Sequence, residues 1–247
     1  MIEVRGISKR FGAAEVLRGV NMSLANGKLT GLIGPSGSGK SLLTRCVVGL
    51  EGFDQGTVAA NGHTIGPGAD KFSVEAFEVR KRVGIVFPPG LIPPYRTAEE
   101  LILEGPIYVR GMRHDKALAF CSQWIDRLGI REHLGKFPRQ LSTGQLARVS
   151  LARALALNPK YLIADEVAAS LDPVLAGEVI EIIGELVSDG IGVLVVTHQI
   201  EFIRQHADFV YFLMRGTIVE KGAPAEILAH PATPELADFL QGVRRGR

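Results

Sequence analysis

Short apolar runs of strand length alternate along the chain with stretches whose apolar residues recur at helical spacing. Most of the short runs are apolar at every position, which is typical of parallel strands covered by helices on both faces. The pattern predicts an α/β fold with a doubly wound, mostly parallel sheet at its core. The predicted strands span residues 2–7, 29–33, 83–87, 161–164, 193–197 and 209–214, and the predicted helices between them span residues 40–50, 143–157, 173–187 and 223–229.

Two segments depart from this alternation. Residues 56–65 predict a β-hairpin, because Asn61-Gly62 is a strong signal for a type I′ turn. Residues 97–157 contain helical patterns and no convincing strand, with predicted helices at 98–109, 115–128 and 143–157. We therefore expect one domain, residues 1–247, in which a helical subdomain at about 89–157 is inserted into an α/β core at about 1–88 and 158–247.

The composition is that of an ordinary globular chain, since 46% of the 247 residues are hydrophobic and 22% are charged. Lys and Arg number 28 and Asp and Glu 26, and this near-balance argues against a dedicated nucleic-acid coat, though not against a local basic patch, so we expect no nucleic-acid partner. No apolar run is long enough to span a membrane, and the N-terminus lacks the apolar core of a signal peptide. We therefore expect a cytoplasmic chain that does not cross a membrane by itself.

A glycine-rich motif follows the predicted strand 29–33 and opens the helix that begins at Lys40. The motif fits GxxxxGK[ST], in which glycines allow backbone N–H groups and a helix N-terminus to surround phosphate oxygens. Lys40 would neutralise the β- and γ-phosphates, and the Ser41 hydroxyl would ligate Mg²⁺. The motif consists of Gly34, Pro35, Ser36, Gly37, Ser38, Gly39, Lys40 and Ser41.

Two adjacent carboxylates follow the predicted strand 161–164. Asp165 is suited to hold Mg²⁺, and Glu166 to orient and polarise an attacking water molecule. By itself, an apolar strand that ends in Asp-Glu is more often the entry to a solvated loop. In combination with the phosphate loop, it predicts a nucleotide-hydrolysing site at the carboxyl edge of the sheet.

The segment Leu141-Ser142-Thr143-Gly144-Gln145, followed by Arg148, resembles the signature motif of ABC-transporter ATPases. The order of motifs is also that of these ATPases: the phosphate loop, the signature, the Asp-Glu strand, Ser170-Leu171-Asp172, and then His198 after a strand. The resemblance covers nearly the whole chain. It implies a RecA-like P-loop NTPase core, an N-terminal antiparallel β subdomain and an inserted helical subdomain specific to this family.

The resemblance also implies roles for individual residues. Phe11 resembles the aromatic residue that stacks on adenine, and a core phenylalanine is the alternative interpretation. Asp172 matches the loop that bridges two active sites, and His198 matches the histidine that contacts the γ-phosphate and Glu166. The signature residues implied to contact ATP from a partner subunit are Ser142, Thr143, Gly144 and Gln145.

Each chain holds one phosphate loop and one signature, so a head-to-tail homodimer would complete two sites with ATP and Mg²⁺ at the interface. The resemblance implies an ATPase subunit that powers transport through transmembrane permease subunits on the inner face of the cell membrane. Residues 220–240 resemble the C-terminus of polar amino-acid importer ATPases, which makes amino-acid import the expected function. A solute-binding protein is then an indirect partner. In the loop at residues 88–96, Leu91, Ile92 and Tyr95 either contact the permease or fold onto their own domain.

The chain departs from the family pattern at Pro88, where ABC ATPases have a glutamine that senses Mg²⁺ and contacts the membrane partner. Proline has no side-chain donor or acceptor, so the interpretations are slow hydrolysis or a harmless variation of the loop. Thr143 and Val167 replace a glycine and a proline, which are milder changes. Two other functions stay open at this point: a non-transport ABC ATPase (regulatory, cell-division or iron–sulfur assembly type), or an ATP-binding module with impaired turnover.

Overall fold

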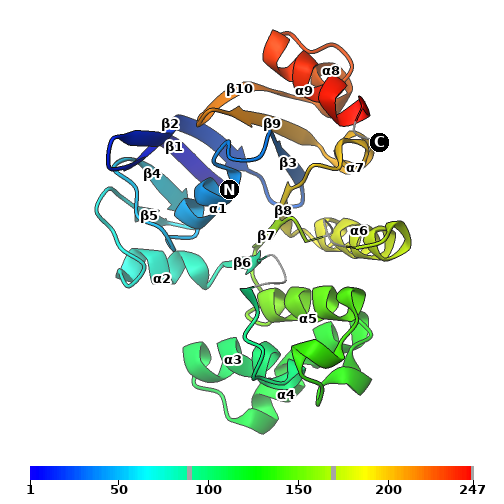
Figure 1. The fold of residues 1–247 in the computed structure, drawn as a ribbon. Helices are drawn as coiled ribbons and strands as arrows, with labels where there is room; N and C mark the ends of the chain where they lie inside the picture. The colour runs from blue at the N-terminus through cyan, green and yellow to red at the C-terminus, as the bar shows by residue number, and fades with distance from the viewer. Residues whose placement is uncertain (88–90, 168–170, 246–247) are drawn as a thin grey trace.

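The computed structural model of the chain describes residues 1–87, 91–167 and 171–245. Figure 1 shows an upper body that holds both β-sheets and a lower body of helices α3, α4 and α5. The upper body contains the antiparallel sheet that the family resemblance implies, with strand order β2-β1-β4-β5. Its strands are β1 (Ile2–Phe11), β2 (Ala14–Leu24), β4 (Gln55–Ala60) and β5 (His63–Ile65).

The second sheet is mostly parallel, as the sequence predicts. Its strand order is β10-β9-β3-β8-β7-β6, and every neighbouring pair is parallel except β10 with β9. The carboxyl ends of β3, β8 and β7 therefore meet at one edge, where α/β folds bind ligands. The strands are β3 (Leu29–Ile33), β6 (Val83–Val86), β7 (Tyr161–Asp165), β8 (Gly192–Val196), β9 (Phe209–Met214) and β10 (Thr217–Gly222).

Side chains alternate between the two faces of this sheet and divide the core into two clusters. Leu32 and Leu194 pack on the face that carries the antiparallel sheet and α1 (Lys40–Val47). Ile33 and Val193 pack on the opposite face, with residues of α6 (Pro173–Ser188) and α7 (Ile200–His206). One face is therefore covered largely by a second sheet, where the apolar pattern alone predicts helices on both faces.

The lower body begins and ends with helices that are capped in the same way. Thr97 and Ser142 accept hydrogen bonds from the backbone N–H groups of Glu100 and Gln145, whose side chains accept from the cap N–H groups in return. Within residues 91–157 the structure contains helices and 3-10 turns but no strand. The three helices are α3 (Ala98–Arg110), α4 (His114–Arg127) and α5 (Thr143–Leu155).

All of the strands and helices predicted from the apolar pattern are present, with bounds that differ by a few residues. The predicted type I′ turn is confirmed, since φ is 51° at Asn61 and 86° at Gly62. Five elements that the pattern does not predict are also present. They are β2, α2 (Val74–Arg80), α7, β10 and α9 (Pro234–Arg245).

The missed elements lack a continuous apolar run. In β10, for example, the apolar pair Ile218 and Val219 is followed by Glu220 and Lys221, and every residue is at least partly exposed. A short helix, α8 (Pro224–Ile227), precedes α9 and lies within the predicted helix 223–229. Among the described residues, no helix is long and apolar enough to cross a membrane.

Candidate nucleotide site

The phosphate loop lies between β3 and α1, which is the position that the motif requires. Gly34 and Gly39 have φ values of 151° and 105°, in the region that favours glycine. A Cβ atom on Gly34 would collide with the carbonyl oxygen of Leu213, so the loop is also packed too closely for a side chain there. Glycine is therefore required both for the turn and for the close approach of β9.

Lys40, the first residue of α1, is buried within this loop. Its ammonium group donates hydrogen bonds to the carbonyl oxygens of Gly34 (2.8 Å) and Pro35 (3.0 Å). Burial lowers the pKa of Lys40, and the nearby charges of Glu166 and Asp165 oppose that shift. The loop thus holds a cation beside the two carboxylates that the sequence analysis singles out.

Asp165, the last residue of β7, is only 3% exposed. Burial raises its pKa, and the Ser41 hydroxyl and the Lys40 charge act in the opposite direction. Its Oδ1 atom is buried and has no hydrogen-bond partner in the described structure. An unpartnered carboxylate oxygen close to a serine hydroxyl fits Mg²⁺, which proteins bind through one or two such groups together with substrate phosphates.

Glu166 and His198 form a pair at the carboxyl ends of neighbouring strands. The His198 Nε2 atom lies 3.1 Å from Glu166 Oε1. Glu166 has a φ of 53°, in the left-handed region, and its backbone N–H donates to the carbonyl oxygen of Val196. Left-handed conformations of non-glycine residues are costly and cluster at functional sites. This geometry turns the Glu166 side chain, which is 35% exposed, toward His198.

The signature residues lie apart from this cluster, at the first turn of α5. Ser142 is the N-cap, Thr143 begins the helix, and Gln145 completes the capping box. Gly144 is buried, and a Cβ atom there would lie 2.9 Å from Leu175 Cδ2 of α6. The helices that α5 packs against are α3, α4 and α6, together with β6. The signature therefore forms a surface separate from the phosphate loop.

Two further predicted residues lie at the ends of elements. Phe11 ends β1 and is 51% exposed, which excludes the alternative interpretation of a core phenylalanine. Its ring centroid lies 5.0 Å from the Lys9 ammonium group. Asp172 caps α6 by accepting hydrogen bonds from the N–H groups of Val174 and Leu175. Pro88 and Ser170 lie outside the described residues.

The structure adds residues that the motifs do not reveal. The backbone N–H of Gly216 donates to the Ser38 carbonyl oxygen at 3.1 Å. A Cβ atom on Gly39 would lie 2.9 Å from Leu17 Cδ2. Segments of β2 and of the β9–β10 turn thus support the phosphate loop from behind. No motif marks them in the sequence, because their contribution is made largely by backbone atoms.

Comparison with known proteins connects this geometry to a family. Residues 17–169 match the family described as "ABC transporter". The L-cystine import ATP-binding protein TcyC of Bacillus subtilis (strain 168) is 36% identical over 243 residues, which cover 98% of each chain. The histidine/lysine/arginine/ornithine transport ATP-binding protein HisP of Escherichia coli (strain K12) is 38% identical over 249 residues, which cover 98% of this chain and 97% of its own.

A solved structure is similar over most of its length. It is a dimeric ATP-binding cassette in a post-hydrolysis state, bound to ADP and Pi, with a TM-score of 0.77 and 26% identity. The match covers 91% of this chain and 99% of that one. This chain belongs to the ABC transporter family and is one of its ATP-binding subunits.

Proposed function

We propose that this chain hydrolyses MgATP and thereby powers the import of an amino acid through a partner permease. The observation that carries the proposal is the convergence of Lys40, Asp165 and the Glu166–His198 pair at the edge formed by β3, β7 and β8. The relatives whose names specify amino-acid transport support the substrate class, because they match this chain over nearly its full length.

Each residue of the cluster has one part in hydrolysis. The loop from Gly34 to Gly39 and the Lys40 ammonium group would bind the phosphates, and Ser41 with Asp165 would hold Mg²⁺. The chemistry that Mg²⁺ would supply there is positive charge that stabilises the transferring phosphate. Glu166 orients the attacking water and accepts its proton, and His198 holds the Glu166 carboxylate in place.

The signature completes the site from a second copy of the chain. Ser142 and the N-terminus of α5 are exposed and present a hydroxyl and a helix dipole to an anion. Thr143, Gly144 and Gln145 form the first turn behind that hydroxyl. Two-fold symmetry then gives two composite sites per homodimer, with Phe11 against adenine and Asp172 near the shared boundary.

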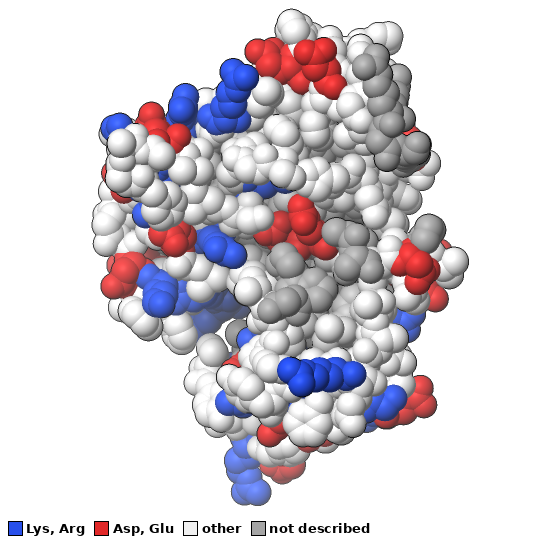
Figure 2. Space-filling view, in the orientation of Figure 1, with Lys and Arg blue, Asp and Glu red and all other residues white. Residues whose placement is uncertain are grey.

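A groove between the two bodies offers the permease contact. It has a volume of about 420 Å³ and lies between β6, α3 and α5. Figure 2 shows an indentation in the outline of the molecule between the upper and lower bodies, with basic side chains beside it. Tyr108, 72% exposed, lines the groove from α3, and Arg80 and Arg153 line it from α2 and α5.

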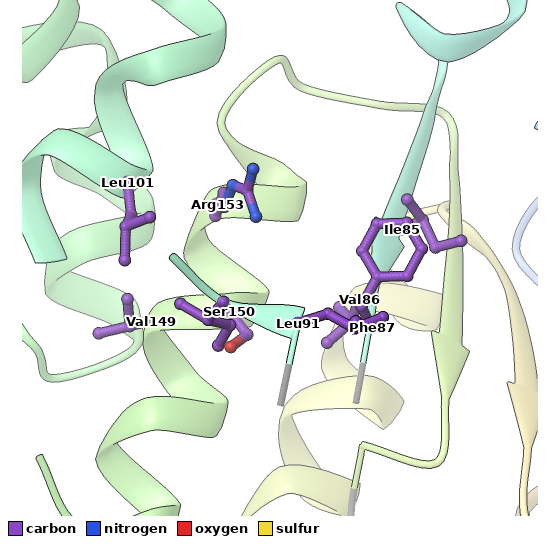
Figure 3. Close-up of a pocket in the computed structure, with 9 residues that line it drawn as sticks. Ile85, Val86, Phe87, Leu91, Leu101, Val149, Ser150 and Arg153 are labelled. Atoms are coloured by element: carbon purple, nitrogen blue, oxygen red, sulfur yellow. The ribbon is translucent and has the colours of Figure 1, made fainter. Parts of the chain in front are cut away.

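A smaller pocket next to the groove is lined in part by Leu91 and Ile92, which belong to the loop predicted to meet the permease. Figure 3 shows Leu91 between Phe87 of the segment after β6 and Ser150 of α5. Leu91 is 55% exposed and Tyr95 is 76% exposed, whereas Ile92 packs on the core of its own domain. Leu91 and Tyr95 are thus available to a permease on the inner face of the membrane, which in turn receives its solute from a solute-binding protein.

Steady-state MgATP hydrolysis by the purified chain tests this function. We expect turnover that Lys40→Ala and Glu166→Gln each reduce by at least about a hundredfold, because each removes a group that acts on the reacting phosphate or water. Both variants also control for contaminating ATPases. Turnover equal in the wild type and both variants would contradict the assignment of the site.

A further inference from the structure

The two oxygens of the buried Asp165 carboxylate have different surroundings. Oδ1 has no partner, whereas Oδ2 lies 3.5 Å from the hydroxyl oxygen of Thr44 on α1. Thr44 is fully buried, so this polar contact is shielded from water. Oδ1 is therefore the oxygen that is left to bind a metal, whereas Oδ2 already contacts the protein.

The Thr44 hydroxyl has a fixed direction. Its one proton has two acceptors within reach: the hydroxyl lies 3.5 Å from Asp165 Oδ2 and donates mainly, at 2.9 Å, to the carbonyl oxygen of Ser41, one turn earlier in the same helix. This bond is a common way for threonine to select its rotamer in a helix. It fixes the hydroxyl between the backbone of Ser41 and Oδ2 of Asp165, the two residues that carry the magnesium ligands.

We propose that Thr44 is a positioning residue for the magnesium site: its hydroxyl shares its one proton between the carbonyl oxygen of Ser41 and Oδ2 of Asp165, which leaves Oδ1 and the Ser41 hydroxyl to face the metal together. The inference rests on the proposed nucleotide site. Its basis is the position of one buried hydroxyl between two ligand residues. Groups that hold a metal ligand without touching the metal commonly change metal affinity by 10- to 100-fold when they are removed.

Binding of Mn²⁺ to the protein with saturating ADP, followed by the EPR signal of free Mn²⁺, measures metal affinity without turnover. We expect Thr44→Val, which keeps the shape of the side chain, to weaken Mn²⁺ binding by about tenfold, at the lower end of that range because the contact to Oδ2 is long. Thr44→Ser keeps the hydroxyl and is expected to stay within about twofold of the wild type. Affinity for a fluorescent ADP analogue in EDTA should be the same in all three proteins.

Two further variants separate a positioning role from a packing role. Ser122→Ala removes a hydroxyl that makes the same bond to the carbonyl three residues earlier, but in α4, and it should not change Mn²⁺ affinity. If Thr44→Val lowers the melting temperature strongly, Thr44→Ala and Thr44→Ser, which both lose the methyl group, isolate the hydroxyl. We expect only Thr44→Ala of that pair to weaken Mn²⁺ binding.

The outcomes are distinct. Mn²⁺ affinity that Thr44→Val and Thr44→Ala leave within about twofold of the wild type would overturn the inference, as would a Thr44→Ser protein as weak as Thr44→Ala. Failure of the wild type to bind the ADP analogue would overturn the proposed function, and this inference with it.

Discussion

Asp165 and Glu166 are neighbours in the chain, yet their carboxyl groups lie in different environments. Asp165 ends a strand and is buried, which suits a metal ligand, whereas the left-handed backbone of Glu166 directs its partly exposed side chain to His198. The sequence predicts both residues, because the acidic pair follows an apolar strand in a chain that also carries a phosphate loop. It does not predict the left-handed conformation, which depends on the hydrogen bond from Glu166 to β8.

The clearest residue-scale question concerns Pro88, whose side chain offers no polar group to metal or water. We expect Pro88→Gln to raise MgATP turnover about tenfold, the lower end of the 10- to 100-fold typical of groups that support a metal site. Steady-state hydrolysis at saturating MgATP measures the effect. Pro89→Gln, at the adjacent proline, is the matched control. Equal turnover in the wild type and Pro88→Gln would mean that the loop variation is harmless.

At the scale of elements, the parallel strands β3, β6, β7, β8 and β9 were predictable because each is largely buried on both faces. Two C-terminal elements, β10 and α9, were not predicted, and one of the contacts that joins them is polar. Glu220 on β10 accepts hydrogen bonds from the backbone N–H groups of Ala232 and Thr233 and from the Thr233 hydroxyl. The sequence does not reveal that Glu220 accepts these bonds, because Ala232 and Thr233 lie 12 and 13 residues further along the chain and meet Glu220 only in the folded structure.

Glu220→Ala should lower the free energy of unfolding by about 1–2 kcal/mol at pH 7, since the carboxylate accepts three hydrogen bonds. Desolvation raises the pKa of Glu220, but these bonds outweigh it and hold the pKa below the ordinary value of 4.5. The stabilisation is therefore present above that pH and lost as the pH falls through the folded-state pKa.

Urea unfolding at pH 7 and at pH 4 measures the change. Lys221→Ala, at the exposed neighbour, should have little effect, and a Glu220→Ala difference that is the same at both pH values would contradict the argument.

At the scale of the whole molecule, the phosphate loop and the signature are on different bodies. The sequence motifs predict both surfaces. The order of the motifs alone does not show that the two surfaces lie on different bodies of the same chain. The structure supplies the reason: α5 packs on the helices of the lower body and on α6, where Gly144 contacts Leu175. Arg148 of α5 also pairs with Glu178 of α6. The signature is thus held by its own body and by α6.

Mixing two inactive variants tests the composite site. Lys40→Ala disables the phosphate-loop half and Ser142→Arg disables the signature half, so each alone should be inactive. In a mixed dimer, one of the two sites receives both intact halves, and an equimolar mixture should regain about a quarter of wild-type turnover. Lys40→Ala mixed with Glu166→Gln, which both affect the same half, should regain none. No recovery in the first mixture would contradict a head-to-tail dimer.

The support behind the phosphate loop has a consequence for any shortened form of the chain. Leu213 and Gly216 contact the loop from residues that follow it by more than 170 positions, and Leu17 contacts it from residues that precede it. A fragment ending after α7 would keep every residue of GxxxxGKS, Asp-Glu and His198, yet lose the backbone of β9 and of the turn after it, which shapes the loop. Such a fragment would carry all of the sequence motifs without the residues that support the phosphate loop, so we expect the smallest unit that binds nucleotide to extend well past His198.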